Sequence, residues 1–119
     1  MPKGDDILER LIEHSVAVLQ LCNELPKGRA ITHIGNQLIR SGSAAAPNYA
    51  EARAGESRQD FIHKLGIVLK ELNESLVWLR LLRKMGVVPT AALEPLINEC
   101  DQLCRIVAAS VKTASGEKH

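Results

Sequence analysis

Aromatic side chains are scarce in this chain of 119 residues, which contains one Phe, one Trp and one Tyr. Proteins that hold single-stranded nucleic acid by base stacking use a row of such rings, so base reading of that kind is not expected. Apolar runs are short as well, and none approaches the ~20 residues that span a bilayer. The N-terminus lacks the apolar core of a secretory signal. We therefore expect a cytoplasmic protein without a membrane partner.

Cysteine is also sparse, and the charge is nearly balanced. Three cysteines are an odd number, and no Cys-x-x-Cys pair occurs, which argues against a disulfide framework and favours reduced thiols. A formal net charge of +1 provides no global field that would concentrate the protein on nucleic acid. Any contact with RNA or DNA is therefore expected to be local.

The sequence also lacks the usual motifs of catalysis and metal binding. Neither a Gly-x-Ser-x-Gly elbow nor a phosphate-binding glycine loop occurs. Di-iron bundles use Glu-x-x-His, and the single Asp60-x-x-His63 is better interpreted as a helix cap with a surface histidine. Cys100 and Cys104 could join His14 at a metal, but buried thiols are favoured because no closed four-ligand spacing is present. We predict no catalytic residue, no cofactor and no metal site.

What the sequence does contain is helical periodicity. Apolar residues recur at intervals of three and four along four segments, and no segment alternates like a strand. Short turns between the segments favour antiparallel neighbours. The pattern predicts one all-α domain over residues 1–119, an antiparallel up-down-up-down four-helix bundle. The helices are expected at about 5–25, 30–54, 57–85 and 90–114.

The middle of the second predicted helix is unusual. Residues 41–47 read Ser-Gly-Ser-Ala-Ala-Ala-Pro, and Pro47 cannot donate the helical hydrogen bond to the Ser43 carbonyl. We expect a kinked but continuous helix, with a break into two pieces as the alternative. The small side chains are interpreted as a point where helices approach closely, rather than as a hinge.

Polar residues line one face of the second helix and the middle of the third. Four of them share a narrow face of the second helix, and two glutamates of the third helix are placed to meet Arg40 or Arg53. We interpret the set as an ion-pair and hydrogen-bond network that fixes helix register. The alternatives are an anion or nucleotide pocket, a solvated face, a subunit contact, or an enzyme or cofactor carrier that uses Glu51, Glu71 and Glu74. The predicted network comprises Gln37, Arg40, Asn48, Glu51, Glu71 and Glu74.

The third helix carries too much apolar surface for one bundle. Residues 76–82 place apolar side chains around nearly the whole circumference of the helix, interrupted only by Arg80. The neighbouring helices of a bundle cover only the side of a helix that faces the core. We predict that Val77, Trp78 and Leu81 form part of an interface between copies of the chain.

Basic residues form small clusters at the ends of the predicted helices. Such clusters favour contacts with phosphate, although cations at a helix C-terminus, such as Arg83 and Lys84, also stabilise the helix dipole. Assembly of several copies would multiply weak clusters into a multivalent surface for RNA. The candidate nucleic-acid contacts are Lys27, Arg29, Arg53, Arg58, Arg80, Arg83 and Lys84.

Four motifs together resemble a known family. They are Gln37-Leu38-Ile39-Arg40-Ser41, Asn48-Tyr49-Ala50-Glu51-Ala52, Ser57-Arg58-Gln59-Asp60-Phe61-Ile62, and Lys70-Glu71-Leu72-Asn73-Glu74 leading into Trp78-Leu79. Over nearly its whole length the chain resembles the four-helix-bundle proteins associated with intervening sequences in bacterial 23S ribosomal RNA genes. The resemblance implies ring-forming homo-oligomers, often pentamers, with no assigned catalytic activity.

A related branch of that family differs in charge. The accessory proteins of diversity-generating retroelements are pentameric and strongly basic, and are held to engage nucleic acid and a reverse transcriptase. This chain, with a net charge of +1, departs from that pattern. The leading hypothesis is a non-enzymatic scaffold that forms a homo-oligomeric ring, expected to be pentameric. The alternative is an RNA-binding accessory factor that acts through local basic clusters.

Overall fold

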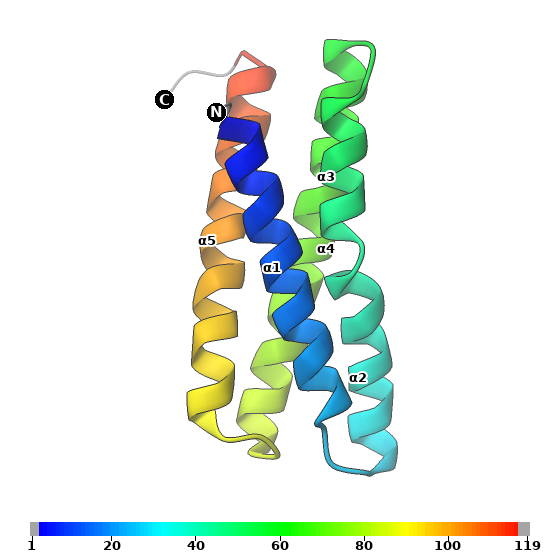
Figure 1. Cartoon of the computed structure of the whole chain (residues 1–119), viewed down its shortest axis with the longest axis vertical. Helices are drawn as coiled ribbons and strands as arrows, with labels where there is room; N and C mark the ends of the chain where they lie inside the picture. Colours follow the sequence, from blue (N-terminus) through cyan, green and yellow to red (C-terminus); the bar gives the residue numbers. More distant parts are fainter. Residues whose placement is uncertain (1–2, 117–119) are drawn as a thin grey trace.

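The computed structural model describes residues 3–116, and these residues form helices joined by short turns. In Figure 1 the chain runs downward through α1, upward through α2 and α3, downward through α4 and upward through α5. The predicted all-α bundle is confirmed, although the ends of the predicted domain 1–119 lie outside the described residues. The helices are α1 Lys3–Asn23, α2 Arg29–Gly42, α3 Ala45–Arg53, α4 Arg58–Met85 and α5 Thr90–Ala114.

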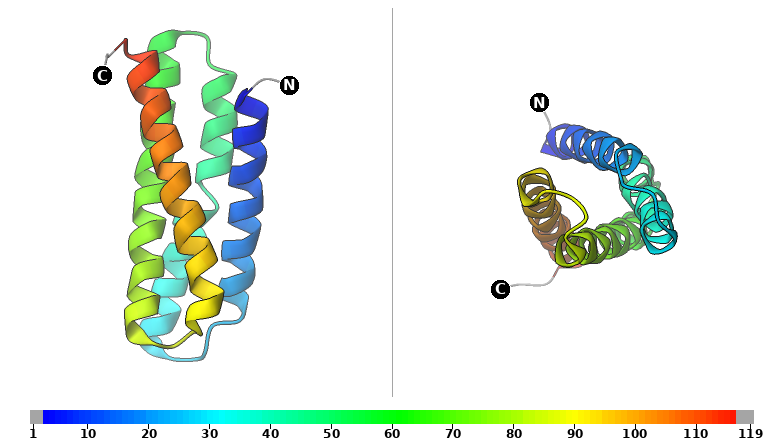
Figure 2. Two further views of the ribbon diagram at one scale, coloured as in Figure 1. Left: turned by 90° about the vertical axis from the view of Figure 1, so that its left-hand side faces the viewer. Right: turned by 90° about the horizontal axis from the view of Figure 1, so that it is seen from below.

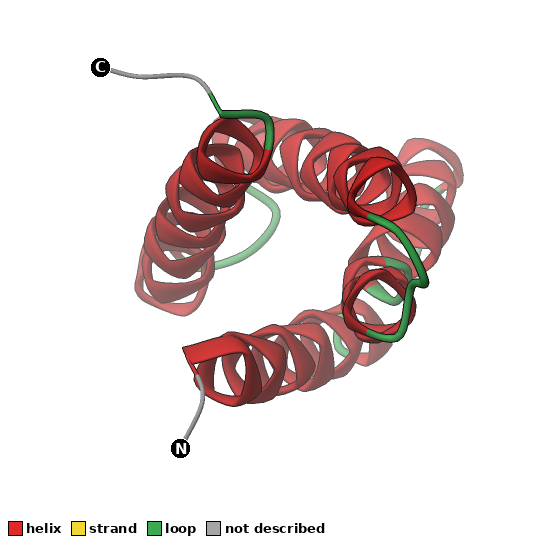
Figure 3. Ribbon diagram, turned by 90° about the horizontal axis from the view of Figure 1, so that it is seen from above, coloured by secondary structure: helices red, strands yellow, loops and turns green. Residues whose placement is uncertain are grey.

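The helices surround one core as four rods, because α3 continues the line of α2 (Figure 1). Both α1 and α4 pack against α2, α3 and α5. Seen end-on, α1 and α4 lie on opposite sides of the bundle (Figures 2 and 3). The molecule is elongated, with principal extents of 45 × 26 × 25 Å. Within residues 3–116, none of the helices combines the length and apolar character that a membrane span requires.

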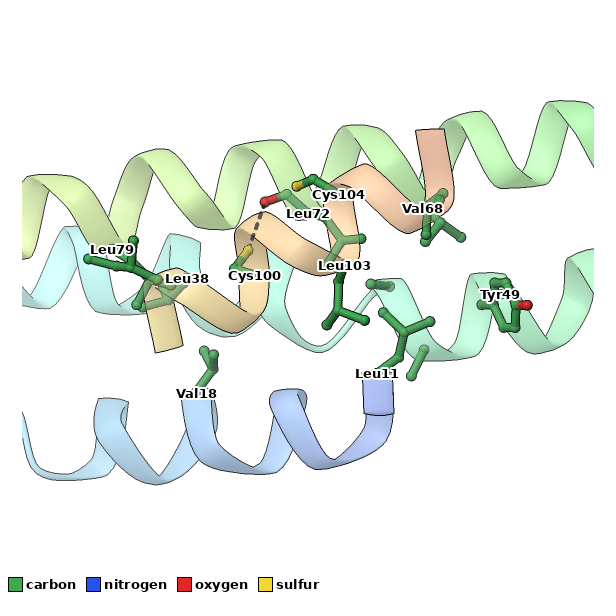
Figure 4. Close-up of a cluster of buried hydrophobic side chains, with 14 of the residues drawn as sticks. Leu11, Val18, Leu38, Tyr49, Val68, Leu72, Leu79, Cys100, Leu103 and Cys104 are labelled. Carbon is green, nitrogen blue, oxygen red and sulfur yellow. Dashed lines mark hydrogen bonds between the residues drawn. The ribbon is translucent and has the colours of Figure 1, made fainter. Parts of the chain in front are cut away.

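The core is built from the apolar stripes that the sequence predicts. Each rod contributes leucine or valine side chains to a continuous buried cluster, and α3 adds Tyr49 (Figure 4). Burying one such aliphatic side chain contributes about 1.5–3 kcal/mol, so these side chains hold the rods together. The residues that Figure 4 labels are Leu11, Val18, Leu38, Tyr49, Val68, Leu72, Leu79, Cys100, Leu103 and Cys104.

Both ends of α4 carry the local signals expected of a well-defined helix. The Ser57 side chain accepts a hydrogen bond of 3.0 Å from the Asp60 N–H, which satisfies one of the free donors of the first turn. At the other end Gly86 adopts a left-handed conformation with φ of 68°, which glycine tolerates and which stops the helix. These signals explain why the predicted limits of this helix match the structure closely.

The predicted kink in the second helix is confirmed, and the helix is interrupted there. Two helices, α2 and α3, stand where one kinked helix over residues 30–54 was expected. The Ala44 N–H bonds to the Ser41 carbonyl at 3.3 Å, a tighter turn than the α-helix makes. Pro47 supplies no N–H for the Ser43 carbonyl, so the regular ladder stops at this point and resumes in α3.

Small residues beside the break allow neighbouring helices to approach closely. The Ser15 hydroxyl on α1 donates to the Gly42 carbonyl at 2.6 Å, and the buried hydroxyls of Ser41 and Ser75 are 2.8 Å apart. A Cβ atom at Gly42 would lie 2.9 Å from the Cγ1 atom of Val18. The structure therefore agrees with a close approach of α1 and α4 to the end of α2.

We predict that Gly42→Ala destabilises the protein by about 1 kcal/mol. Overpacking against the stiff, buried Val18 costs roughly 1–3 kcal/mol, and the better helix propensity of alanine offsets up to about 1 kcal/mol of that. Gly66→Ala is the matched control, because an added Cβ there meets nothing within 4 Å, and it should stabilise by about 0.5–1 kcal/mol. Urea unfolding followed by circular dichroism measures both, and equal stabilisation by the two changes would contradict the close approach.

Candidate functional site

Arg40 links α2 to α4 at the seam between these helices. Its Nη1 atom donates to the Glu71 carboxylate at 3.2 Å, and its Nη2 atom donates to the Glu74 carboxylate. Its Nε atom donates to the side-chain oxygen of Gln37 at 3.3 Å. The structure thus brings together these four members of the predicted network. Because the Arg40 side chain is 49% exposed, the cluster lies on the surface of the bundle rather than inside it.

Trp78 belongs to the same seam. Its indole Nε1–H donates to the Glu74 carboxylate at 3.1 Å, and its ring meets the His33 ring edge-on with centroids 6.1 Å apart. The pKa of Glu74 is lowered first by the hydrogen bond from Arg40 and then by the one from Trp78. His33 precedes Gln37 by one helical turn and faces the same seam, but no sequence pattern singled it out.

Asn48 and Glu51 make separate contacts higher on the bundle. The Asn48 side-chain amide donates to the Ala44 carbonyl at 2.8 Å, next to the helix break, where the same carbonyl also accepts the Asn48 N–H at 3.2 Å. Glu51 accepts a hydrogen bond from the Lys64 ammonium at 2.8 Å. The six residues proposed as one network therefore fall into a cluster around Arg40 and two local contacts.

A second seam, between α1 and α5, carries a contact that the sequence did not reveal. The Arg10 guanidinium donates to both oxygens of Glu99 at 3.0 and 2.7 Å and to the side-chain oxygen of Gln102 at 3.2 Å. Below it His14 is buried, and its ring nitrogens have no hydrogen-bond partner among the described residues. Burial lowers the pKa of His14, against the opposing effect of the Glu99 charge, so the neutral imidazole is favoured.

The cysteines behave as small packing residues. Cys100 and Cys104 are buried, and the Cys100 thiol donates to the Leu72 carbonyl at 3.3 Å. Burial raises the pKa of Cys22 to about 11, which keeps this thiol protonated and poorly nucleophilic at neutral pH. In the part of the chain that the structure describes, no cluster of three or more His, Cys, Asp or Glu side chains could hold a metal ion.

The apolar surface of α4 divides between the seam and the solvent. Val77 and Leu81 are 53% and 39% exposed, and Met85, one turn further on, is 42% exposed. Together with Arg80 and Lys84, Val77 and Leu81 line a shallow hollow of about 250 Å³. Trp78, by contrast, is half-buried and packs against the core. Of the three predicted interface residues, Val77 and Leu81 point outward, whereas Trp78 lies in the seam with α2.

The predicted nucleic-acid contacts do not form one continuous patch. Arg53 is paired with Asp5 at 2.6 Å, and Arg83 with Glu94 at 2.9 Å. The other five are exposed and form no ion pair with another described residue. Arg58 begins α4 at the upper end of Figure 1. The remaining four, Lys27, Arg29, Arg80 and Lys84, lie toward the lower end, where α2 begins and α4 ends.

We predict that Glu74→Gln weakens the pH dependence of stability in acid. Because the folded-state pKa of Glu74 is lowered, its contribution is present above the unfolded-state pKa and is lost as the pH falls through the folded-state pKa. Urea unfolding at pH 7 and pH 3, followed by Trp78 fluorescence, should therefore show a smaller loss of stability in Glu74→Gln than in the wild type. Glu56→Gln, at an exposed turn position, is the control. An unchanged acid loss in Glu74→Gln would refute the role given to this carboxylate.

Comparison with known proteins agrees with the sequence motifs and the fold. The sequence model of the family of 23S rRNA-intervening sequence proteins matches residues 5–109 of this chain. The chain is similar to a protein with unknown function from the S23 ribosomal protein family of Bacteroides thetaiotaomicron, whose crystal structure shares 29% sequence identity and a TM-score of 0.85. The similarity covers 93% of this chain and 99% of that chain. No protein with a curated description matches. Since the match extends over most of the sequence and the fold is shared, the chain belongs to the family of 23S rRNA-intervening sequence proteins.

Proposed function

We propose that the protein is a non-enzymatic helical scaffold whose copies assemble into a ring. The observation that carries this proposal is the row of exposed apolar side chains on α4, Val77, Leu81 and Met85. Apolar side chains gathered on a surface are typical of protein interaction sites. The resemblance to ring-forming proteins adds the expectation of five copies.

No catalytic role is assigned, because the polar clusters are occupied in holding helices together. The carboxylates of Glu71 and Glu74 accept hydrogen bonds from Arg40, and Glu74 accepts a further one from Trp78. A carboxylate held by a cation at a helix seam has a structural purpose and little freedom to act as a general base. The third carboxylate weighed for catalysis, Glu51, is paired with Lys64.

We predict that the wild-type protein elutes as a multiple of its 13.0 kDa chain mass in size-exclusion chromatography with light scattering at micromolar concentration. The pair Val77→Glu and Leu81→Glu should shift it to the single-chain mass, because charges would replace the apolar contact. Ile39→Glu, at a side chain on α2 that is 40% exposed, is the matched control and should leave the assembly intact. A wild-type monomer would contradict the scaffold proposal.

The second candidate is an RNA-binding accessory factor. The observation that favours it is that Lys27, Arg29, Arg80 and Lys84 lie toward one end of the bundle and form no ion pair with a described residue. In a ring of parallel copies this end would repeat around the axis, and repeated weak contacts with phosphate would add up. Lys27 and Arg29 would then be the main contacts, since Arg80 and Lys84 border the apolar hollow of α4.

Filter binding of a structured RNA at two salt concentrations tests this candidate. If the protein binds RNA through phosphate contacts, the amount of retained RNA falls steeply as the salt concentration rises. The pair Lys27→Glu and Arg29→Glu should weaken binding. It should also reduce the salt dependence, because each lost phosphate contact lowers the slope of log binding constant against log salt concentration by about 0.9. Arg105→Glu is the control, since that side chain is 79% exposed on α5. Retention that does not respond to salt would exclude the RNA-binding candidate.

A further inference from the structure

A second row of exposed apolar residues lies on α1, on the side of the bundle opposite α4 (Figures 2 and 3). Ile12 and Val16 are 41% and 48% exposed. Three exposed carboxylates lie on the same helix before Val16, and the nearest cation on this helix, Arg10, is turned toward Glu99 on α5. We call Asp6, Glu9, Ile12, Glu13 and Val16 the α1 outer face. This surface thus combines two exposed apolar side chains with three exposed carboxylates.

The exposed side of α4 has the opposite charge. Lys70, Arg80 and Lys84 flank the apolar side chains there, and all three are exposed. The two glutamates of the same stretch are turned toward Arg40 and do not neutralise them. We call Lys70, Val77, Arg80, Leu81, Lys84 and Met85 the α4 outer face. The molecule therefore presents an apolar acidic surface on one side and an apolar basic surface on the other.

The two faces also lie at the same height along the bundle. Ser15 on α1 bonds to Gly42 at the end of α2, and the neighbouring Ser41 bonds to Ser75 on α4. Residues 15 and 75 are thus roughly level, and α1 and α4 run in the same direction (Figure 1). It follows that Val16 is level with Val77 to within about one turn, and that Glu9 is level with Lys70.

We propose that the α1 outer face of one copy docks on the α4 outer face of a second copy. This inference rests on the proposed scaffold function and identifies the two surfaces that would make its interface. Docked side by side in parallel, the faces would place Val16 against Val77 and Glu9 beside Lys70. Charge complementarity of this kind selects the register and penalises the like-charged pairing of two α4 faces or of two α1 faces.

The level position of the two faces meets one of the two requirements of a closed ring, the other being a turn between successive copies. A contact between two different surfaces of each copy is heterologous, and repeated heterologous contacts produce rings or open filaments. Because the two faces are level, each added copy is displaced sideways but not along the bundle axis, and a ring requires this absence of a rise. Association costs translational and rotational freedom, and the three apolar side chains of α4 alone would not offset that cost. In this pairing the apolar residues of both faces are buried in one interface and offset it together.

Charge reversal on each face tests the pairing. One variant carries Glu9→Lys and Glu13→Lys, and the other carries Lys70→Glu and Asn73→Glu at the exposed α4 positions that lie level with them. Each alone should raise the dissociation constant at least ~100-fold, because like charges would face each other, and should give the single-chain mass in light scattering. A single chain that carries all four changes should reassemble, since every interface between its copies again joins opposite charges, whatever the number of copies. Circular dichroism confirms that each variant is helical, and the reassembly itself requires folded protein.

The possible outcomes separate the pairing from the scaffold proposal. A monomeric wild type would overturn the scaffold proposal and the pairing with it. An assembled wild type whose mass does not respond to the α1 reversal would overturn the pairing alone. Dissociation of both variants without reassembly of the chain that combines their changes would likewise exclude the pairing of these two faces.

Discussion

Helix α4 meets three different surroundings around its circumference, and the rest of the bundle is arranged about it. Leu72 and Leu79 face the core and are almost fully buried. Glu74 faces sideways, where Arg40 and Trp78 hold its carboxylate. Val77 faces the solvent. A four-rod bundle with a single core covers only the first two directions, so the third is the natural place for contact with another molecule.

The seam between α2 and α4 shows how polar contacts complement the core. The hydroxyl pair of Ser41 and Ser75 is buried, whereas Arg40 beside it is half exposed and reaches across to α4. Surface ion pairs contribute little stability each, yet together with the buried hydroxyls they favour one register of the two helices. The interrupted helix assists this arrangement, because small residues at the break let α1 come close to α2.

Periodicity and caps were sufficient to predict α1, α4 and α5, because the spacing of apolar residues reflects burial and because Ser57 and Gly86 mark the limits of α4. The second predicted helix proved to be two, α2 and α3. Arg40 and its two glutamates were predicted as well. Residues on one helix face can, however, lie at different heights along the bundle. Asn48 and Glu51 lie too far along to reach Arg40 and instead contact the Ala44 carbonyl and Lys64. Trp78 was predicted to face outward with Val77, although successive helix positions diverge by about 100°. The bridge from Arg10 to Glu99 joins residues 89 positions apart, and no sequence pattern indicates it.

Cross-linking of a chain that carries both Val16→Cys and Val77→Cys tests most directly whether the outer faces of α1 and α4 meet between copies. The native cysteines are buried or half-buried, so the wild type under the same mild oxidation is the baseline. If the outer faces of α1 and α4 join neighbouring copies, the double variant gives covalent multimers on a non-reducing gel, and neither single variant gives a series longer than a dimer. A double variant that stays a single chain, with both new thiols open to a soluble thiol reagent, would show that these two faces do not meet.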